Sequence, residues 1–190
     1  MITGHVLSVQ VGAARPLATG RGEVASGIVK REVAGRIAVG ALGLAGDEQA
    51  DLTVHGGLAK AVYAYPVEHY AFWQARQAEW GVSPGLRHGA LGENLTVAGV
   101  LEADLYVGDE LCFPDCTLRV TQPRHPCFKL NAVLQSEDAA RSMSRSGYCG
   151  YYLAVDVPGT VAAGDAFTVR AGARHTPLLS LFKFARPRGS

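Results

Sequence analysis

Short apolar runs alternate with glycine-containing turns along most of the chain. Runs of this length and spacing are typical of β-strands in a barrel or a sandwich. We expect strands at residues 5–11, 28–33, 61–65, 94–97, 109–113, 117–122, 151–157 and 166–170. The pattern therefore predicts a mainly β fold.

Gly-Asp pairs recur at 46–47, 108–109 and 164–165, and the second and third stand just before an expected strand. Glycine can take the left-handed conformation of a turn, and aspartate can cap it. We interpret Asp109 and Asp165 as structural turn residues. The interpretation is weaker for Asp47, which lies in a longer polar stretch.

Two helices interrupt the expected strands. The first should run from Pro66 to Trp80, because proline is favourable at the first helical position. Its core face should contain Val67, Tyr70, Ala71, Trp73, Ala78 and Trp80. We interpret these aromatic residues as core rather than as a cofactor stack. The second helix should begin at Ser136, which can cap it, and end at Gly147.

The residues from Thr176 onward form an apolar pattern separate from that of the expected strands. Thr176 and Pro177 can start a helix, and Leu178, Leu181 and Phe182 follow with the spacing of an apolar stripe. We therefore expect a domain at residues 1–172 and a short helical tail at 173–190. The tail should dock on the domain or on a second copy of the chain, which leaves a homodimer open.

Composition narrows the class of protein. The chain has 190 residues, 48% of them hydrophobic and 18% charged, as expected for a compact globular protein. A net charge of +1 argues against nucleic acid as a partner. The N-terminus lacks the pattern of a signal peptide, and no apolar run is long enough to span a bilayer. We expect a cytoplasmic protein with free thiols rather than disulfides.

Three of the four cysteines have ordinary explanations. Cys112 and Cys116 are separated by three residues, but no further ligands follow with the spacing of a zinc site. We expect them to be plain hairpin cysteines. Cys149 precedes an apolar strand and should be a buried, inert thiol.

Cys127 differs in its charged surroundings. In the stretch QPRHPCFKLN, residues 122–131, Arg124 and His125 precede the cysteine and Lys129 follows it. Between Cys116 and Ser136 there is no acidic residue. Cations favour the thiolate, which is the nucleophilic and metal-binding form of cysteine. The neighbouring prolines restrict the backbone. This pattern predicts a positioned, functional thiol in positively charged surroundings, and a turn with a buried cysteine is the alternative.

Two weaker stretches point to the same kind of site. His55-Gly56-Gly57 would let an imidazole and bare backbone amides approach a ligand closely. Glu93 and Asn94 stand at the start of an expected strand, where they either touch a ligand or brace the rim. Each stretch alone also fits a structural turn.

In combination and in this order, these motifs resemble the MOSC family, the domain found at the C-terminus of molybdenum cofactor sulfurases and in stand-alone bacterial proteins. The nearest branch is the one linked to 6-N-hydroxylaminopurine resistance. The resemblance spans roughly residues 3–170 and is carried by GDEQAD (46–51), HGG (55–57), KAV (60–62), YP (65–66), GENL (92–95), VGD (107–109), QPRHPCFKL (122–130), GYY (150–152) and AGD (163–165).

The resemblance implies a β-barrel with a few peripheral helices, and a molybdenum cofactor (molybdopterin) as the ligand. It also implies that Cys127 is the catalytic residue and either ligates the metal or carries sulfur. Related proteins reduce N-hydroxylated compounds with electrons from a separate donor protein. Pyridoxal phosphate would enter only through a partner desulfurase.

A pterin cofactor with a phosphate tail needs cations and backbone N–H donors. Lys30, His55, Arg124 and Lys129 are the expected cations, and Gly56 and Asn94 complete the expected cofactor-binding set. Lys30 is the one member of this set that lies far upstream of the other motifs.

Two other functions stay open. The chain could carry the cofactor, or sulfur as a Cys127 persulfide, without turnover. It could also be a metal-free thiol enzyme in which His125 or His55 activates Cys127. The hydroxylaminopurine branch commonly continues into a small helical domain that we do not expect here, because the sequence ends at Ser190.

Overall fold

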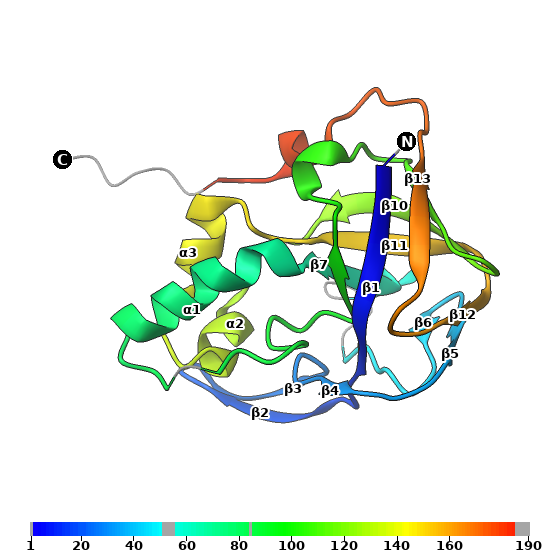
Figure 1. Ribbon diagram of the computed structural model, residues 1–190. Helices are drawn as coiled ribbons and strands as arrows, with labels where there is room; N and C mark the ends of the chain where they lie inside the picture. Colours follow the sequence, from blue (N-terminus) through cyan, green and yellow to red (C-terminus); the bar gives the residue numbers. More distant parts are fainter. Residues whose placement is uncertain (1, 51–55, 84, 185–190) are drawn as a thin grey trace.

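The computed structural model describes residues 2–50, 56–83 and 85–184 (Figure 1). Its centre is a closed barrel, which confirms the mainly β prediction. The barrel order is β1 (Ile2–Val11), β8 (Leu95–Ala98), β7 (Val62–Pro66), β11 (Tyr151–Val157), β10 (Thr117–Pro123), β9 (Glu110–Cys112) and β13 (Ala166–Arg170). Strand β13 pairs with β1 and closes the ring. Among the strand pairs of the described barrel, β7 and β8 are the one parallel pair.

Smaller sheets surround the barrel. Strand β4 (Arg31–Glu32) extends the end of β1. The hairpin β2 (Arg15–Thr19) and β3 (Gly22–Ser26) stands apart, and β5 (Ile37–Gly40) pairs with both β12 (Gly159–Val161) and β6 (Gly43–Leu44). The sequence pattern did not predict these short strands, apart from β4 within the expected strand at 28–33. Most of their residues are exposed or half-buried, so they lack a clear apolar repeat.

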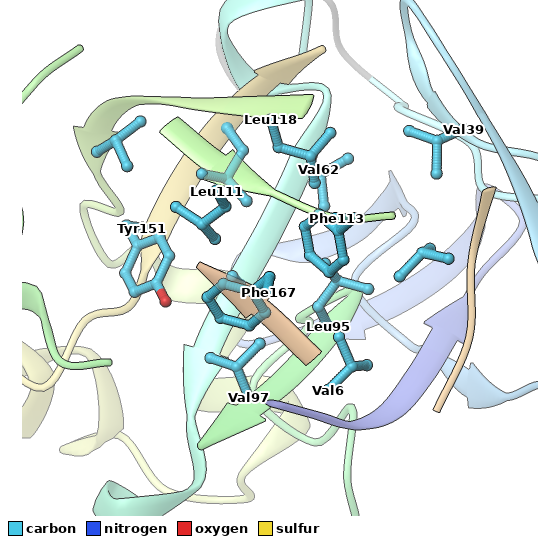
Figure 2. Packing of buried hydrophobic residues seen from close by; sticks show 14 of the residues in the cluster. Val6, Val39, Val62, Leu95, Val97, Leu111, Phe113, Leu118, Tyr151 and Phe167 are labelled. Atoms are coloured by element: carbon cyan, nitrogen blue, oxygen red, sulfur yellow. The ribbon is translucent and has the colours of Figure 1, made fainter. Parts of the chain in front are cut away.

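The barrel interior is filled by aliphatic side chains together with Phe113, Tyr151 and Phe167 (Figure 2). Strand β7 is buried on both faces. Val62 and Ala64 point into this interior, whereas Tyr63 and Tyr65 belong to a second cluster outside the barrel wall. This division follows from the two-residue period of a strand.

The second cluster lies between the wall and three helices, which gather on one side of the barrel (Figure 1). They are α1 (Tyr70–Glu79), α2 (Phe128–Val133) and α3 (Ala139–Ser146). Four 3₁₀ turns complete the fold, at Leu58–Lys60, Val67–His69, Glu102–Asp104 and Leu178–Leu181. Helix α3 ends at Gly147 as predicted, in the left-handed conformation with φ 75°. Helix α2 was not predicted.

The predicted core face of α1 was partly wrong. Tyr70 and Trp73 are buried as expected, but Ala71 and Ala78 are exposed. Gln77 is buried in their place. The buried positions therefore have spacings of three and four residues, the repeat of a narrow helical stripe.

Asp109 and Asp165 are turn residues, as predicted. Asp109 accepts hydrogen bonds from the N–H groups of Tyr106 and Gly172, and Asp165 accepts one from Ala162. Each carboxylate also pairs with an arginine, Arg174 and Arg36 respectively. These aspartates hold loops rather than a ligand.

The described part of the tail packs against both clusters, with Leu178 in the barrel cluster and Phe182 in the second cluster. Thr176 accepts a hydrogen bond from Val107 N–H, and Leu178 N–H donates to Leu105 O. Leu178 and Phe182 are buried, whereas Leu181 is 43% exposed. Among the described residues, no helix has both the length and the apolar character needed to cross a membrane.

Candidate functional site

A cleft opens between the ends of β7, β8 and β10 and the start of α2. It encloses about 660 Å³, counting the part open to solvent. Its described lining is Ser26, Gly27, Ile28, Lys30, Asp47, Glu48, Gln49, Ala50, Lys60, Ala61, Tyr63, Gly92, Asn94, Arg124, His125, Cys127, Lys129 and Tyr152.

Cys127 lies at the junction between β10 and α2. It is extended (φ −134°, ψ 169°) and caps the helix, so that its carbonyl oxygen accepts the N–H of Leu130 at 3.0 Å. Pro126 precedes it, and a residue before proline cannot easily be helical, so the chain stays extended up to this point. The thiol is half-buried and faces the cleft. The positioned cysteine expected from the sequence thus stands at a helix start rather than in a loop.

Arg124 is the most deeply buried cation of the cleft, with 5% of its surface exposed. Its guanidinium lies 5.1 Å from the centroid of the Tyr63 ring, and Nη1 donates to Met143 Sδ at 3.6 Å. Within the described residues no carboxylate forms an ion pair with it. Burial lowers its pKa, but the neighbouring Tyr63, Tyr152 and Cys127 outweigh this and raise the pKa above its usual value. Arg124 is therefore a permanent buried cation.

Lys30 also lines the cleft, but its charge is already paired. Its ammonium group forms a short ion pair with Asp47, and both side chains are 7% exposed. Asp47 also accepts the N–H of Gly12 at 2.8 Å. The Gly-Asp turn at 46–47 thus differs from the other two, because its carboxylate pairs with a residue that lines the cleft. Paired in this way, Lys30 offers a ligand less positive charge than Arg124 does.

Two more lysines stand at the mouth of the cleft. Lys129 donates to the carbonyl of Ala25 at 3.2 Å, which ties α2 to the hairpin strand β3. The ammonium of Lys60 lies 5.8 Å from the Tyr152 ring centroid. Lys60 was not among the residues predicted to bind the cofactor. The only sequence signal for it was its place in the KAV motif of the family resemblance.

Asn94 and Glu93 brace the rim. Asn94 Oδ1 accepts the N–H of Tyr63 at 3.0 Å, and its Nδ2 donates to Gln10 O at 3.3 Å. Glu93 is fully buried and accepts hydrogen bonds from four donors, Tyr70 OH, Gly89 N, Leu91 N and Thr96 OH. Asn94 still lines the cleft, but its amide is largely used by neighbouring strands.

The structure describes two residues of the HGG stretch, Gly56 and Gly57. His55 lies outside the described residues. Gly56 is described but is absent from the cleft lining given above. A Cβ at Gly56 would come within 2.3 Å of Gln49 Oε1, so the glycine makes room for a protein side chain rather than for a ligand. Gln49 Oε1 also accepts the N–H of Gly57 at 2.7 Å.

His125 contacts the tail. Its ring is stacked on Phe182, with centroids 5.6 Å apart and 4° between the planes. Burial, together with the positive charges of Lys183 and Lys60, lowers the pKa of His125 below 6.5. A stacked ring with a lowered pKa is neutral near pH 7.

Cys116 and Cys149 are buried, and Cys112 is half-buried. None of the four cysteines forms a disulfide bond in the described part of the chain. Burial raises the pKa of Cys116 to about 11 and also raises that of Cys149. No group of three or more His, Cys, Asp or Glu side chains suited to a metal ion occurs in the described part of the chain.

A family model described as MOSC domain matches residues 51–168. Protein YiiM of Escherichia coli K12 is 41% identical over 141 residues, which cover 73% of this chain and 61% of that protein. The chain thus spans about three fifths of the length of this relative.

The chain is also similar to a fungal protein and to a solved crystal structure. A protein named Reductase from Gibberella moniliformis is 34% identical over 168 residues, covering 87% of this chain and 29% of that protein. The crystal structure of YiiM from Geobacillus stearothermophilus superposes with a TM-score of 0.70 at 30% identity, covering 88% of this chain and 75% of the other. The barrel with its flanking helices is therefore shared with these proteins.

Proposed function

Because the chain belongs to the MOSC domain family, we propose that it binds a molybdenum cofactor and reduces N-hydroxylated compounds, with Cys127 as the protein ligand of the metal. The family is associated with this cofactor, and one relative is named a reductase. The substrate class and the role of the cysteine are our inference from the family resemblance.

The observation that carries the proposal is the buried charge of Arg124 beside the Cys127 thiol. A charge removed from water is costly unless it is paired. Arg124 is 5% exposed and has no carboxylate partner within the described ranges, so an anion in the cleft would complete it. A cofactor with a phosphate tail supplies such an anion.

The residues present fit this cofactor. The thiolate of Cys127 is a soft ligand suited to a thiophilic metal. Arg124 can bind phosphate oxygens through its planar fork, while Lys60 and Lys129 add point charges at the mouth. Each charge-assisted hydrogen bond contributes about 1.5–3 kcal/mol. Lys30 would bind more weakly, because Asp47 neutralises it.

The proposed reaction converts an N–OH group to N–H with release of water, and it consumes two electrons and two protons. When bound, the molybdenum cofactor would supply the redox chemistry. The chain would bind and orient the cofactor, and the open side of the cleft would admit the substrate. The electrons would come from a separate donor protein.

The test is turnover of an amidoxime to the amidine by protein made in a cofactor-competent host, with reduced methyl viologen as the electron donor. We expect activity in the parent and none in Cys127→Ala. Cys112→Ala is the matched control, because Cys112 is another half-buried thiol, located in β9. The proposal fails if the molybdenum-loaded parent reduces neither an amidoxime nor an N-hydroxylated base.

The second candidate function is carriage of the cofactor, or of sulfur as a Cys127 persulfide. It is favoured by the partial exposure of Cys127 in an open cleft, where an acceptor enzyme could reach it. This function predicts stable loading without turnover. Mass spectrometry of the intact chain would detect the extra sulfur atom, and turnover at enzymatic rates would exclude the carrier function.

A further inference from the structure

We infer that Glu102, which does not line the cleft, is a positioning residue that holds Arg124 in its anion-binding orientation. The inference concerns the anion site itself. It rests on the proposed function only in that the natural anion would be the cofactor phosphate.

Glu102 is a buried acid, 3% exposed, in the 3₁₀ turn Glu102–Asp104. Its Oε2 is 2.7 Å from His69 Nε2, and its Oε1 accepts the N–H groups of Cys149 at 3.0 Å and Gly150 at 2.5 Å. His69 is itself fixed, because its ring stacks on Tyr148 with centroids 4.0 Å apart. One carboxylate oxygen therefore binds two successive N–H groups of the segment that enters β11, those of Cys149 and Gly150. The N–H of Cys149 is shared with Gly147 O at 2.9 Å.

This segment, residues 148–150, has a backbone that needs such support. Gly150 is left-handed (φ 65°), and a Cβ there would lie 2.5 Å from Ala64 O. The carbonyls of Tyr148 and Cys149 accept the hydroxyl groups of Tyr65 at 2.9 Å and Tyr63 at 2.8 Å. The segment is thus held by Glu102 through its N–H groups and by two tyrosines through its carbonyls.

Two contacts lead from the segment to Arg124. Gly150 O accepts the backbone N–H of Arg124 at 3.3 Å. Tyr63, whose hydroxyl donates to Cys149 O, presents its ring to the Arg124 guanidinium at 5.1 Å. Both the backbone and the side chain of Arg124 are therefore set by residues that Glu102 fixes. Without the carboxylate, the N–H of Gly150 would lose its acceptor, and the N–H of Cys149 would keep only Gly147 O. The segment would have to move for Gly150 to regain an acceptor.

The molecule contains a matched control. Asp109 is also a buried carboxylate that accepts two backbone N–H groups and pairs with a basic side chain, Arg174. It lies before β9 and does not line the cleft. Its loss should disturb the fold to a similar degree while leaving Arg124 in place.

The experiment measures the dissociation constant of inorganic phosphate by isothermal titration calorimetry, at fixed ionic strength, on the full chain made without the cofactor. We expect Glu102→Ala to weaken phosphate binding about tenfold, equivalent to about 1.4 kcal/mol. Glu102→Gln keeps an oxygen acceptor for the two N–H groups and should restore affinity to within about threefold of the parent. Asp109→Ala should bind phosphate as the parent does.

If Glu102→Ala does not fold, His69→Phe replaces it. This variant keeps a ring against Tyr148 and removes the Nε2 partner of Glu102, so phosphate affinity should fall several-fold. The inference is overturned if Glu102→Ala or, in its place, His69→Phe binds phosphate as tightly as Asp109→Ala. It is also overturned if the parent does not bind phosphate at all.

Molybdenum content of the same variants, made in a cofactor-competent host, separates the two proposals. Loss of phosphate affinity in Glu102→Ala with no molybdenum in any variant would sustain the role of Glu102 and defeat the proposed function. Molybdenum in the parent with unchanged phosphate affinity in Glu102→Ala would do the reverse.

Discussion

Asp109 and Arg124 are both buried charges at the end of a barrel strand, but their surroundings differ. Asp109 precedes β9, and its carboxylate is satisfied by Arg174 and two backbone N–H groups. Arg124 follows β10, and its neighbours are two tyrosine rings, a thioether and the Cys127 thiol. The charge of Asp109 is therefore satisfied within the protein, and its role is structural. Arg124 has a charge that the described residues leave uncompensated, which is the property expected of a binding site.

Removing Asp109 should have the largest effect on stability. Asp109→Ala leaves two N–H groups and a guanidinium without their partner, so the free energy of unfolding should fall by about 3 kcal/mol. Urea denaturation would measure it. A loss below about 1 kcal/mol would mean that Asp109 contributes less to stability than its hydrogen bonds and ion pair indicate.

Removing Arg124 should give the opposite pattern. Arg124→Met deletes a buried charge without a carboxylate partner, so the free energy of unfolding should stay within about 1 kcal/mol of the parent or rise. Phosphate binding should weaken by about 2–3 kcal/mol, because the fork-shaped donor is lost. Calorimetry and urea denaturation on the same preparation test both halves. Strong destabilisation with unchanged binding would make Arg124 a structural residue.

The ion pair of Lys30 and Asp47 extends the comparison, because it places a charge that is already paired in the same cleft as Arg124. Asp47→Asn keeps an oxygen for Gly12 N–H but frees the charge of Lys30. Phosphate should then bind more tightly, by about 1 kcal/mol. Asp165→Asn, which frees Arg36 in the same kind of Gly-Asp turn, is the control and should leave affinity unchanged. Equal affinities for all three proteins would contradict the account.

His125 should give the smallest effect. Burial and the charges of Lys183 and Lys60 lower its folded-state pKa below 6.5, so the unfolded chain takes up the proton first as the pH falls. Stability should therefore decline as the pH drops through 6.5, by less than about 0.5 kcal/mol from this partly exposed group. His125→Gln should flatten that part of the pH profile of unfolding. A steeper decline in the variant would mean that His125 changes stability with pH in the direction opposite to the one predicted.

Much of the barrel could be predicted from the sequence. Strands β1, β7, β8, β10, β11 and β13 carry apolar runs bounded by turn residues, and these were located to within a few residues. The hairpin of β2 and β3 was missed, because it buries little and has no apolar repeat. Helix α2 was missed as well, since six residues after a proline give no measurable period.

The candidate site, too, could be predicted only in part from the sequence. Arg124, Cys127 and Lys129 are neighbours in sequence, so their shared charge pattern was visible. The pairing of Lys30 with Asp47 and the burial of Glu102 against His69 depend on contacts 17 and 33 residues apart. No local pattern encodes such contacts, and a polar residue in a linear sequence does not indicate whether its partner is protein or ligand.

The most direct test is molybdenum content per chain, measured by elemental mass spectrometry on protein purified without oxygen from a cofactor-competent host. The account predicts about one molybdenum atom per chain in the parent and in Cys112→Ala, and almost none in Cys127→Ala, because only Cys127 offers a thiolate to the metal in the cleft. Parent protein without molybdenum, or Cys127→Ala with as much molybdenum as the parent, would contradict it.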